Sequence, residues 1–228
     1  MNVTWKRFFL STVAFVLSIA FLMTAAHAAV VAINAGGGAY TASDGTSYLA
    51  DVHFTGGSTY ATTQDIVNTG DDPLYQTQRY GFGSEFSYNI PIDDGVYDIT
   101  LHFAELYYDN AGDQIFDVFI EDKSGPDIGN LDILDEADGK FRAHTVTITS
   151  VSVEDGELNI TFSGAHDASI CAIEVNLAAP TAEIFADPVT INKGQEVNLS
   201  WETKYATNVS IDQGIGIVGD SGSTTVSP

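Results

Sequence analysis

The most regular feature of this chain is a two-residue alternation of apolar and polar side chains. The segment 96–103 places Tyr97, Ile99, Leu101 and Phe103 on one side. The segment 158–163 alternates Leu158, Ile160 and Phe162 with polar residues. Such alternation is typical of β-strands with one buried face. Asp-Gly pairs at 94–95, 138–139 and 155–156 punctuate these runs as turns. We therefore expect an all-β protein, built as an antiparallel β-sandwich or jelly roll.

Two departures from the alternation make sharper predictions. Residues 115–120 form a nearly continuous apolar run, which we expect to be a strand buried on both faces. Val146 and Ile148 lie at even positions, whereas Val151 and Val153 lie at odd ones. A one-residue slip turns every side chain to the opposite face of a strand. A bulge or turn is therefore expected near 149–150.

The N-terminal segment 1–28 has the pattern of a secretory signal peptide. Lys6 and Arg7 precede an apolar run over 8–23, and Ala26-His27-Ala28 is a small-x-small cleavage site. A membrane anchor is the alternative, but the run is short for a bilayer span of about 20 residues. We expect cleavage after Ala28, a secreted or extracellular product, and membrane attachment only if the signal stays uncleaved.

A second domain boundary is expected near 178–181, which leaves a domain over 29–178 and a remainder over 179–228. Pro188, Gly194 and the Leu-Ser-Trp sequence ending at Trp201 resemble the opening strands of an immunoglobulin-like sandwich. Such a sandwich usually needs about 100 residues, so we expect an incomplete immunoglobulin-like domain here. Trp201 is then expected to be its core tryptophan.

The charge of the chain narrows the classes of ligand. Eight basic residues stand against 31 acidic ones, for a net charge of −23. Nucleic acids and anionic lipid surfaces would be repelled, because phosphate binding needs lysine and arginine. A neutral ligand is the class most compatible with the negative electrostatic field of such an acidic protein. The single cysteine, Cys171, allows no internal disulfide, and we expect it to be an ordinary buried residue in phase with Ile173, Val175 and Leu177.

Four stretches concentrate residues that can bind a ligand or shape a site. Residues 33–38 read Ile-Asn-Ala-Gly-Gly-Gly, but they lack the G-x-G-x-x-G spacing of a dinucleotide site, so the glycines more plausibly serve sharp turns. The other three are Leu-Tyr-Gln-Thr-Gln-Arg-Tyr over 74–80, Leu-His-Phe-Ala-Glu-Leu-Tyr-Tyr over 101–108, and Gly-Ala-His-Asp over 164–167. Of these three, the first holds two tyrosines and an arginine, the second is a strand that ends in paired tyrosines, and the third is a polar loop before the last strand.

These stretches resemble the malectin domain family over about 30–177. Further matches are Gly56-Gly57, Phe-Ser-Tyr-x-Ile-Pro over 86–91, Phe-Asp-Val over 116–118 and Ala-Ile-Glu-Val over 172–175. The resemblance implies a jelly-roll, galactose-binding-like sandwich with a carbohydrate site formed by loops at one end. Members of the family bind short glucose oligomers through several tyrosines or a phenylalanine and an aspartate.

Carried over by motif, the resemblance implies a set of sugar-binding residues: Tyr60, Tyr80, Tyr107, Tyr108 and Asp167. This agrees with the chemistry of a pyranose, whose apolar face suits an aromatic ring and whose hydroxyl groups suit a carboxylate. His166 is the nearest substitute for Asp167. We expect Arg79 to be a structural ion-pair partner, and Glu105 to be a buried support for the loop that follows it.

Three alternatives stay open at this point. Glu105, Asp109 and Asp167 could converge as the paired carboxylates of a glycoside hydrolase-associated domain. Acidic turns at 109–113 or 71–72 could hold calcium, although they lack the spacing of an EF-hand loop. The chain could also be a purely structural or adhesive surface module. We expect no catalytic residue, no metal and no cofactor, and an oligosaccharide or polysaccharide as the partner.

Overall fold

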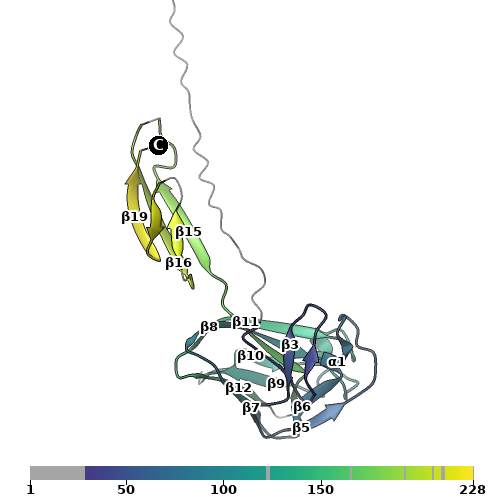
Figure 1. Cartoon of the computed structure of the whole chain (residues 1–228). Coiled ribbons are helices and arrows are strands. Elements are labelled where there is room, and N and C mark those ends of the chain that lie inside the picture. The colour runs from purple at the N-terminus through teal and green to yellow at the C-terminus, as the bar shows by residue number, and fades with distance from the viewer. Residues whose placement is uncertain are drawn as a thin grey trace, which may run out of the picture. The chain divides into compact units, whose positions relative to one another are not determined.

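The structure is a computed structural model that describes residues 29–121, 124–164, 166–192, 194–206, 208–211 and 214–227. The expected signal peptide, 1–28, lies outside the described residues. The chain divides into a larger unit that ends at Ala178 and a smaller unit that begins at Ala179 (Figure 1). Within the described ranges, no helix is long and apolar enough to cross a membrane.

The larger unit is nearly all β, as the alternation predicted. Its first sheet has the order β11-β8-β14-β1-β3-β2, and its second has the order β10-β9-β12-β7-β4. Neighbouring strands are antiparallel, apart from the parallel pair β1 and β3. The bounds in the first sheet are β1 (Val31–Asn34), β2 (Tyr40–Thr41), β3 (Ser47–Ala50), β8 (Gly95–Phe103), β11 (His144–Val153) and β14 (Ala172–Leu177). Those in the second are β4 (Phe54–Thr55), β7 (Phe86–Pro91), β9 (Phe116–Ile120), β10 (Ile128–Leu131) and β12 (Glu157–Ser163).

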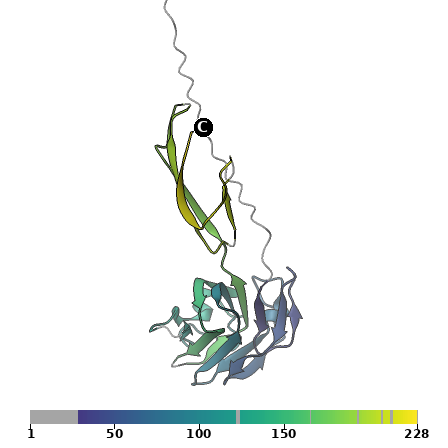
Figure 2. The same ribbon diagram turned by 60° about the vertical axis from the view of Figure 1, so that its left-hand side comes forward.

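The hydrophobic core lies between these two sheets. Tyr97, Ile99, Leu101 and Phe103 of β8 are all buried, as are Leu158, Ile160 and Phe162 of β12. The predicted facing of both strands is therefore confirmed. Burying each such side chain stabilises the fold by about 1.5–3 kcal/mol. Figure 2 shows the strands of the larger unit curving around this common interior.

The strand over residues 116–120 corrects one prediction. In β9 only Phe116, Val118 and Ile120 are buried, whereas Asp117 and Phe119 are partly exposed. The prediction of burial on both faces is wrong, because the side chains of β9 alternate between the core and a face that is partly exposed to solvent. The expected bulge is confirmed: the pairing of β11 with β8 shifts register between Ile148 and Val151, and Ser150 has a φ of 60°.

A third, three-stranded sheet carries the candidate site. Its order is β13-β6-β5, with β5 (Ser58–Ala61), β6 (Thr77–Gly81) and β13 (Ala168–Ile170). Two short helices complete the unit, α1 (Asp72–Tyr75) and α2 (Ile133–Glu136). Cys171 follows β13 and is buried, as expected. Leu177, however, is exposed at the end of β14, and Cys171 packs in a different cluster from Ile173 and Val175, so the predicted common phase of these residues is wrong.

The smaller unit contains one three-stranded sheet, β15-β16-β19, and one hairpin, β17-β18. The bounds are β15 (Thr181–Asp187), β16 (Val197–Lys204), β17 (Val209–Ile211), β18 (Gly216–Val218) and β19 (Ser221–Val226). Trp201 is only half-buried, so the prediction of a core tryptophan is wrong. Its ring lies against Gly222 of the neighbouring strand, and its Nε1 donates to the Gly219 carbonyl at 3.0 Å. The immunoglobulin-like character of this segment stays a prediction.

Candidate functional site

A cleft of about 160 Å³ opens over the three-stranded sheet. This is smaller than the 300–1,000 Å³ typical of sites for drug-sized ligands, so it would hold only part of an extended molecule. Eight side chains line it: Tyr60, Gln78, Tyr80, Phe82, Tyr107, Tyr108, Gln114 and Asp167. The structure therefore brings together all five residues that the sequence singled out, from four separate stretches of the chain.

The pairing of β6 with its neighbours sets which side chains face the cleft. Tyr60 of β5 lies opposite Gln78, and Ser169 of β13 lies opposite Tyr80. Because side chains alternate along a strand, Gln78 and Tyr80 share one face and Arg79 points to the other. One strand thus supplies both the cleft and the anchor behind it.

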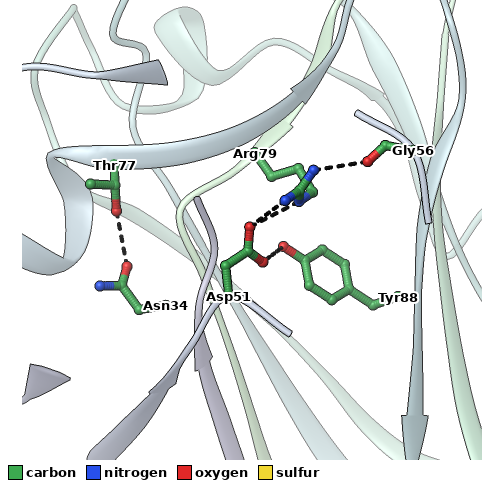
Figure 3. Close-up of polar contacts among 6 residues, drawn as sticks. All are labelled: Asn34, Asp51, Gly56, Thr77, Arg79 and Tyr88. Carbon is green, nitrogen blue, oxygen red and sulfur yellow. Dashed lines mark hydrogen bonds and ion pairs between the residues drawn. The ribbon is translucent and has the colours of Figure 1, made fainter. Parts of the chain in front are cut away.

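Arg79 is that anchor (Figure 3). Its Nη2 and Nε lie 2.6 and 3.0 Å from Asp51 Oδ2, and its Nη1 donates to the Gly56 carbonyl at 2.8 Å. The second oxygen of Asp51 accepts from the Tyr88 hydroxyl at 2.8 Å. Arg79 and Asp51 side chains are only 6% and 9% exposed, so the pair is buried. The expectation that Arg79 is a structural ion-pair partner is confirmed.

The glycine cluster at 36–38 serves close packing against the same strand. Gly36 has a φ of +71°, and a Cβ there would lie 2.3 Å from the Gln78 carbonyl oxygen. Only glycine fits this combination of backbone angle and proximity. Beside it, the Thr77 hydroxyl donates to Asn34 Oδ1 at 3.0 Å (Figure 3). The first stretch noted in the sequence therefore supports the cleft from behind.

The aromatic pair that follows β8 is held by one buried carboxylate. Glu105 is 2% exposed, and its Oε1 accepts from the backbone N–H groups of Tyr107 and Tyr108 at 2.7 Å each. Burial raises the pKa of Glu105. Lys140 Nζ donates to the Tyr107 carbonyl at 2.7 Å. The expectation that Glu105 is a buried, hydrogen-bonded support for this loop is confirmed.

The ring of Tyr107 contacts two other tyrosine rings of the cleft. The Tyr107 ring meets Tyr60 edge to face at 6.1 Å between centroids, and meets Tyr108 in the same way at 5.1 Å. Edge-to-face pairs are a favourable arrangement of aromatic rings. Tyr107 is nevertheless 63% exposed. An exposed aromatic surface of this kind, held in place by its neighbours, can cover the apolar face of a ligand at little entropic cost.

Asp167 closes one side of the cleft. Its Oδ2 accepts from the Tyr108 hydroxyl at 2.8 Å, and its Oδ1 accepts from the backbone N–H of Gly83 at 3.2 Å. Burial and this hydrogen bond raise the pKa of Tyr108 to about 12. A carboxylate has about four acceptor positions, so two contacts leave capacity for a ligand's hydroxyl groups. His166, the alternative, is exposed and does not line the cleft.

Three lining residues were not among the predictions: Gln78, Phe82 and Gln114. Phe82 is 79% exposed in the turn after β6, and an apolar ring so exposed could have been suspected from its Gly-Phe-Gly context. The two glutamines, Gln78 in β6 and Gln114 in the loop before β9, gave no comparable signal, because glutamine side chains usually face solvent.

The acidic turns considered for calcium have other partners. Asp71 accepts hydrogen bonds from Tyr40 and from the backbone and side chain of Ser43, at 2.8 Å each. Asp109 accepts from Lys140 Nζ at 2.8 Å. In the part of the chain that the structure describes, no group of three or more His, Cys, Asp or Glu residues could hold a metal ion.

Comparisons with known proteins agree with this fold. The family model described as the Malectin domain matches residues 29–186. The chain is 34% identical over 144 residues to Malectin-B from Xenopus laevis, covering 58% of this chain and 50% of that protein. It is 36% identical over 156 residues to kinesin-like protein KIN-14E from Oryza sativa subsp. japonica, covering 63% of this chain and 14% of that protein. The match thus spans about half of the malectin and a small part of the kinesin-like protein.

Solved structures show a likeness of fold. The extracellular domain of ANXUR1 from Arabidopsis thaliana superimposes with a TM-score of 0.57 at 19% identity, covering 64% of this chain and 47% of that one. A beta-glucuronidase from Bacteroides uniformis gives a TM-score of 0.55 at 23% identity, covering 65% of this chain and 18% of that one. At these identities the likeness concerns the fold alone.

Proposed function

The chain belongs to the malectin domain family, and on that premise we propose that its cleft binds short, neutral, glucan-type oligosaccharides without catalysing their reaction. One observation carries the proposal. Tyr60, Tyr80, Tyr107 and Tyr108 line a single cleft together with the carboxylate of Asp167. Rings and a carboxylate at one rim match the two surfaces of a pyranose, its apolar face and its hydroxyl edge.

The charge of the chain favours a neutral ligand. The net charge of −23 and the presence of Asp167 at the rim both oppose an anionic sugar. A cleft of this size covers only part of an oligosaccharide and leaves the rest in water. We therefore expect weak binding, with a Kd on the order of micromolar to millimolar, or about −4 to −8 kcal/mol.

The placement of the acids argues against hydrolysis. A glycosidase needs two carboxyl groups flanking the bond, about 5–5.5 Å or 6.5–9.5 Å apart. Among the described residues that line the cleft, Asp167 is the one carboxylate. Glu105 is committed to two backbone N–H groups, and Asp109 forms an ion pair with Lys140. The likeness to the beta-glucuronidase concerns the fold alone, so it gives no evidence for a second catalytic carboxylate in this cleft.

We further propose a role for the rest of the chain. Residues 29–178 would be the sugar-binding domain of a secreted, larger protein, exported by the segment 1–28. Residues 179–228 would be an immunoglobulin-like spacer. The sugar-binding domain would then serve targeting or adhesion. A purely structural module differs from this proposal in one respect, because it would not bind sugar.

The proposal is tested by titrating the protein with maltose-series and laminarin-series oligosaccharides in a calorimeter, and by analysing the sugar afterwards. We expect saturable binding to at least one series, no hydrolysis product, and weaker binding after Tyr107→Ala or Tyr108→Ala. Phe185→Ala, which removes an exposed ring from the smaller unit, is the matched control. Absence of binding to both series, release of product, or unchanged affinity in both tyrosine variants would overturn the proposal.

A further inference from the structure

Beneath the tyrosine rings, the cleft has a polar floor made by Gln78 and Gln114. We propose that the side-chain oxygens of these two residues accept hydrogen bonds from hydroxyl groups on the inserted edge of the sugar. The floor would then select ligands whose inserted edge carries free hydroxyl groups. This inference rests on the proposed function and adds to it the residues that set specificity.

The first observation is that both glutamines are buried without being satisfied. Gln78 is 5% exposed and Gln114 is 4% exposed, and both line the cleft. The Oε1 atom of each has no hydrogen-bond partner within the described ranges. Buried polar atoms in folded proteins are nearly always paired, so two unpaired acceptors in one cleft call for an explanation.

The second observation is that the neighbouring contacts fix where these groups lie. Gln78 lies opposite Tyr60 in the β5–β6 pairing and shares the face of Tyr80 on its own strand, so it is a neighbour of both residues. Gln114 Nε2 donates to Ser169 Oγ at 3.3 Å, and Ser169 lies opposite Tyr80. The Ser169 contact takes the nitrogen end of the Gln114 amide and leaves its oxygen end available.

The other buried side-chain atoms without a hydrogen-bond partner lie outside this cleft. Among the described residues, two other buried side-chain atoms have no hydrogen-bond partner. They are His102 Nε2, which lies 3.7 Å from Glu174 Oε2, and Asn176 Oδ1, and neither residue lines the cleft. Within the cleft, therefore, the unpaired atoms are both amide oxygens, which are acceptors. They call for a ligand that brings donors.

The chemistry of an acceptor pair defines the ligand class. A sugar hydroxyl donates a hydrogen bond, whereas an ether oxygen, an O-methyl group or a carboxylate cannot. A buried acceptor left unpaired costs about 1–3 kcal/mol, which a ligand hydroxyl would recover on binding. A sugar that is deoxy or O-methylated at the inserted edge would leave the cost in place and bind more weakly.

This arrangement makes an unusual prediction about stability. If the unpaired oxygens serve to bind a ligand, they destabilise the protein in the absence of sugar. Replacing them by an apolar group of similar shape should remove that cost. Gln78→Met should therefore leave the melting temperature unchanged or raise it, while weakening the affinity for sugar. Gln114→Met should also weaken the affinity, but it removes the hydrogen bond to the buried Ser169 hydroxyl and so should not raise the melting temperature. A residue with only a structural role would lose stability when replaced.

The experiment measures both quantities on the full chain. Calorimetric titration with maltotriose and with laminaritriose gives the Kd, and thermal unfolding without sugar gives the melting temperature. For the triose that the unaltered protein binds, we expect each variant to weaken the Kd about 5- to 100-fold, the equivalent of the cost of an unpaired acceptor. Gln64→Met, at an exposed glutamine that does not line the cleft, should change neither quantity.

A panel of monodeoxy and mono-O-methyl derivatives of the same sugar identifies the hydroxyl groups that are read. The unaltered protein should discriminate against at least one derivative, and a methionine variant should lose that discrimination. If a methionine variant, compared with the unaltered protein, lost the same affinity for the parent sugar and for every derivative, the inference would be overturned.

The outcomes separate this inference from the proposed function. If the unaltered protein binds neither triose nor longer members of their series, the proposed function fails. If it binds and both methionine variants bind equally well, the floor reads no hydroxyl group and only the further inference fails. If Gln78→Met loses stability together with affinity, Gln78 is structural, and again only the further inference fails.

Discussion

The hydroxyl of Tyr108 donates a 2.8 Å hydrogen bond to the carboxylate of Asp167, a residue 59 positions away in the chain. This bond joins the loop after β8 to the loop before β13. Because Glu105 fixes the backbone of Tyr108 and Gly83 contacts the other oxygen of Asp167, both partners are held from two sides. A ring and a carboxylate at one edge of the cleft are thereby set in place before any ligand arrives, which lowers the entropic cost of binding.

The ring and the hydroxyl of Tyr108 should contribute separately to binding. We expect Tyr108→Ala to weaken sugar binding by about 1–3 kcal/mol, because it removes an aromatic surface from the cleft. Tyr108→Phe keeps the ring and loses only the bond to Asp167, so its effect should be smaller. Calorimetric titration with the best-bound oligosaccharide measures both. An equal loss in the two variants would mean that the ring makes no contact with the sugar.

The ion pair behind the cleft should matter mainly for stability. Removing one partner of a buried pair leaves the other charge uncompensated, and this typically costs about 3–5 kcal/mol. We therefore expect Asp51→Asn, which leaves the charge of Arg79 without its counter-ion, to lower the free energy of unfolding by that order in urea denaturation. The matched control is Asp109→Asn, which breaks an ion pair whose acid is 81% exposed and should cost less than about 1 kcal/mol. Similar losses in both variants would contradict this view of Arg79.

Gly36 and Gly38, at the two ends of the glycine cluster, offer a test of the packing against β6. An alanine at Gly36 would adopt a left-handed φ and place its Cβ against the Gln78 carbonyl, so we expect Gly36→Ala to lose at least about 1–3 kcal/mol of stability and also to weaken sugar binding. Gly38→Ala meets no atom within 4 Å and should be close to neutral. Thermal unfolding and one titration of each variant suffice. A stable, fully binding Gly36→Ala protein would refute the proposed support.

Glu174 should make the free energy of unfolding depend on pH in the acidic range. This residue accepts hydrogen bonds from Tyr48 at 3.0 Å and Asn176 at 2.8 Å, and its Oε2 lies 3.7 Å from His102 Nε2. The neighbouring His102 ring and these hydrogen bonds lower the pKa of Glu174 from 4.5 to about 2. Because the pKa is lower in the folded state, Glu174 stabilises the fold above pH 4.5, and this contribution is lost as the pH falls toward 2.

Comparison with Glu174→Gln isolates that contribution. The difference in the free energy of unfolding between the two proteins should be constant above about pH 5 and should shrink between about pH 4.5 and 2. Urea denaturation at a series of pH values measures it. A difference that stays the same down to pH 2 would show that the carboxylate is not stabilised in its charged form.

The strands could be predicted because the information that forms them is local. Alternation along 95–103 and 157–163 depends on residues two positions apart, and both strands bury the predicted side chains. The run at 115–120 was misread because apolar residues such as Phe119 can also lie on the open face of a sheet. Apolar content alone does not say how many faces of a strand are covered.

The candidate site was predictable in part, and for a different reason. The five rim residues were found through motifs, since no local pattern indicates that Tyr60 and Tyr107 will meet. Gln78 occupies the variable position of the motif over 74–80, and Gln114 lies outside any such motif. Their burial follows from strand pairing and from loops packed over them, which are tertiary features. Unpaired acceptors become visible only when every neighbour has been placed.

The central claim is that four tyrosine rings converge on a bound sugar, and the ten tyrosines of the chain provide their own control. The most direct measurement is nuclear magnetic resonance of protein with ¹³C-labelled tyrosine rings, titrated with the maltose and laminarin oligosaccharides to about 10 mM, above most of the expected Kd range. The ring signals of Tyr60, Tyr80, Tyr107 and Tyr108 should shift together with one Kd, while those of the buried Tyr48, Tyr75, Tyr88 and Tyr97 stay fixed. Shifts confined to other tyrosines, or no shift with either series, would contradict the account.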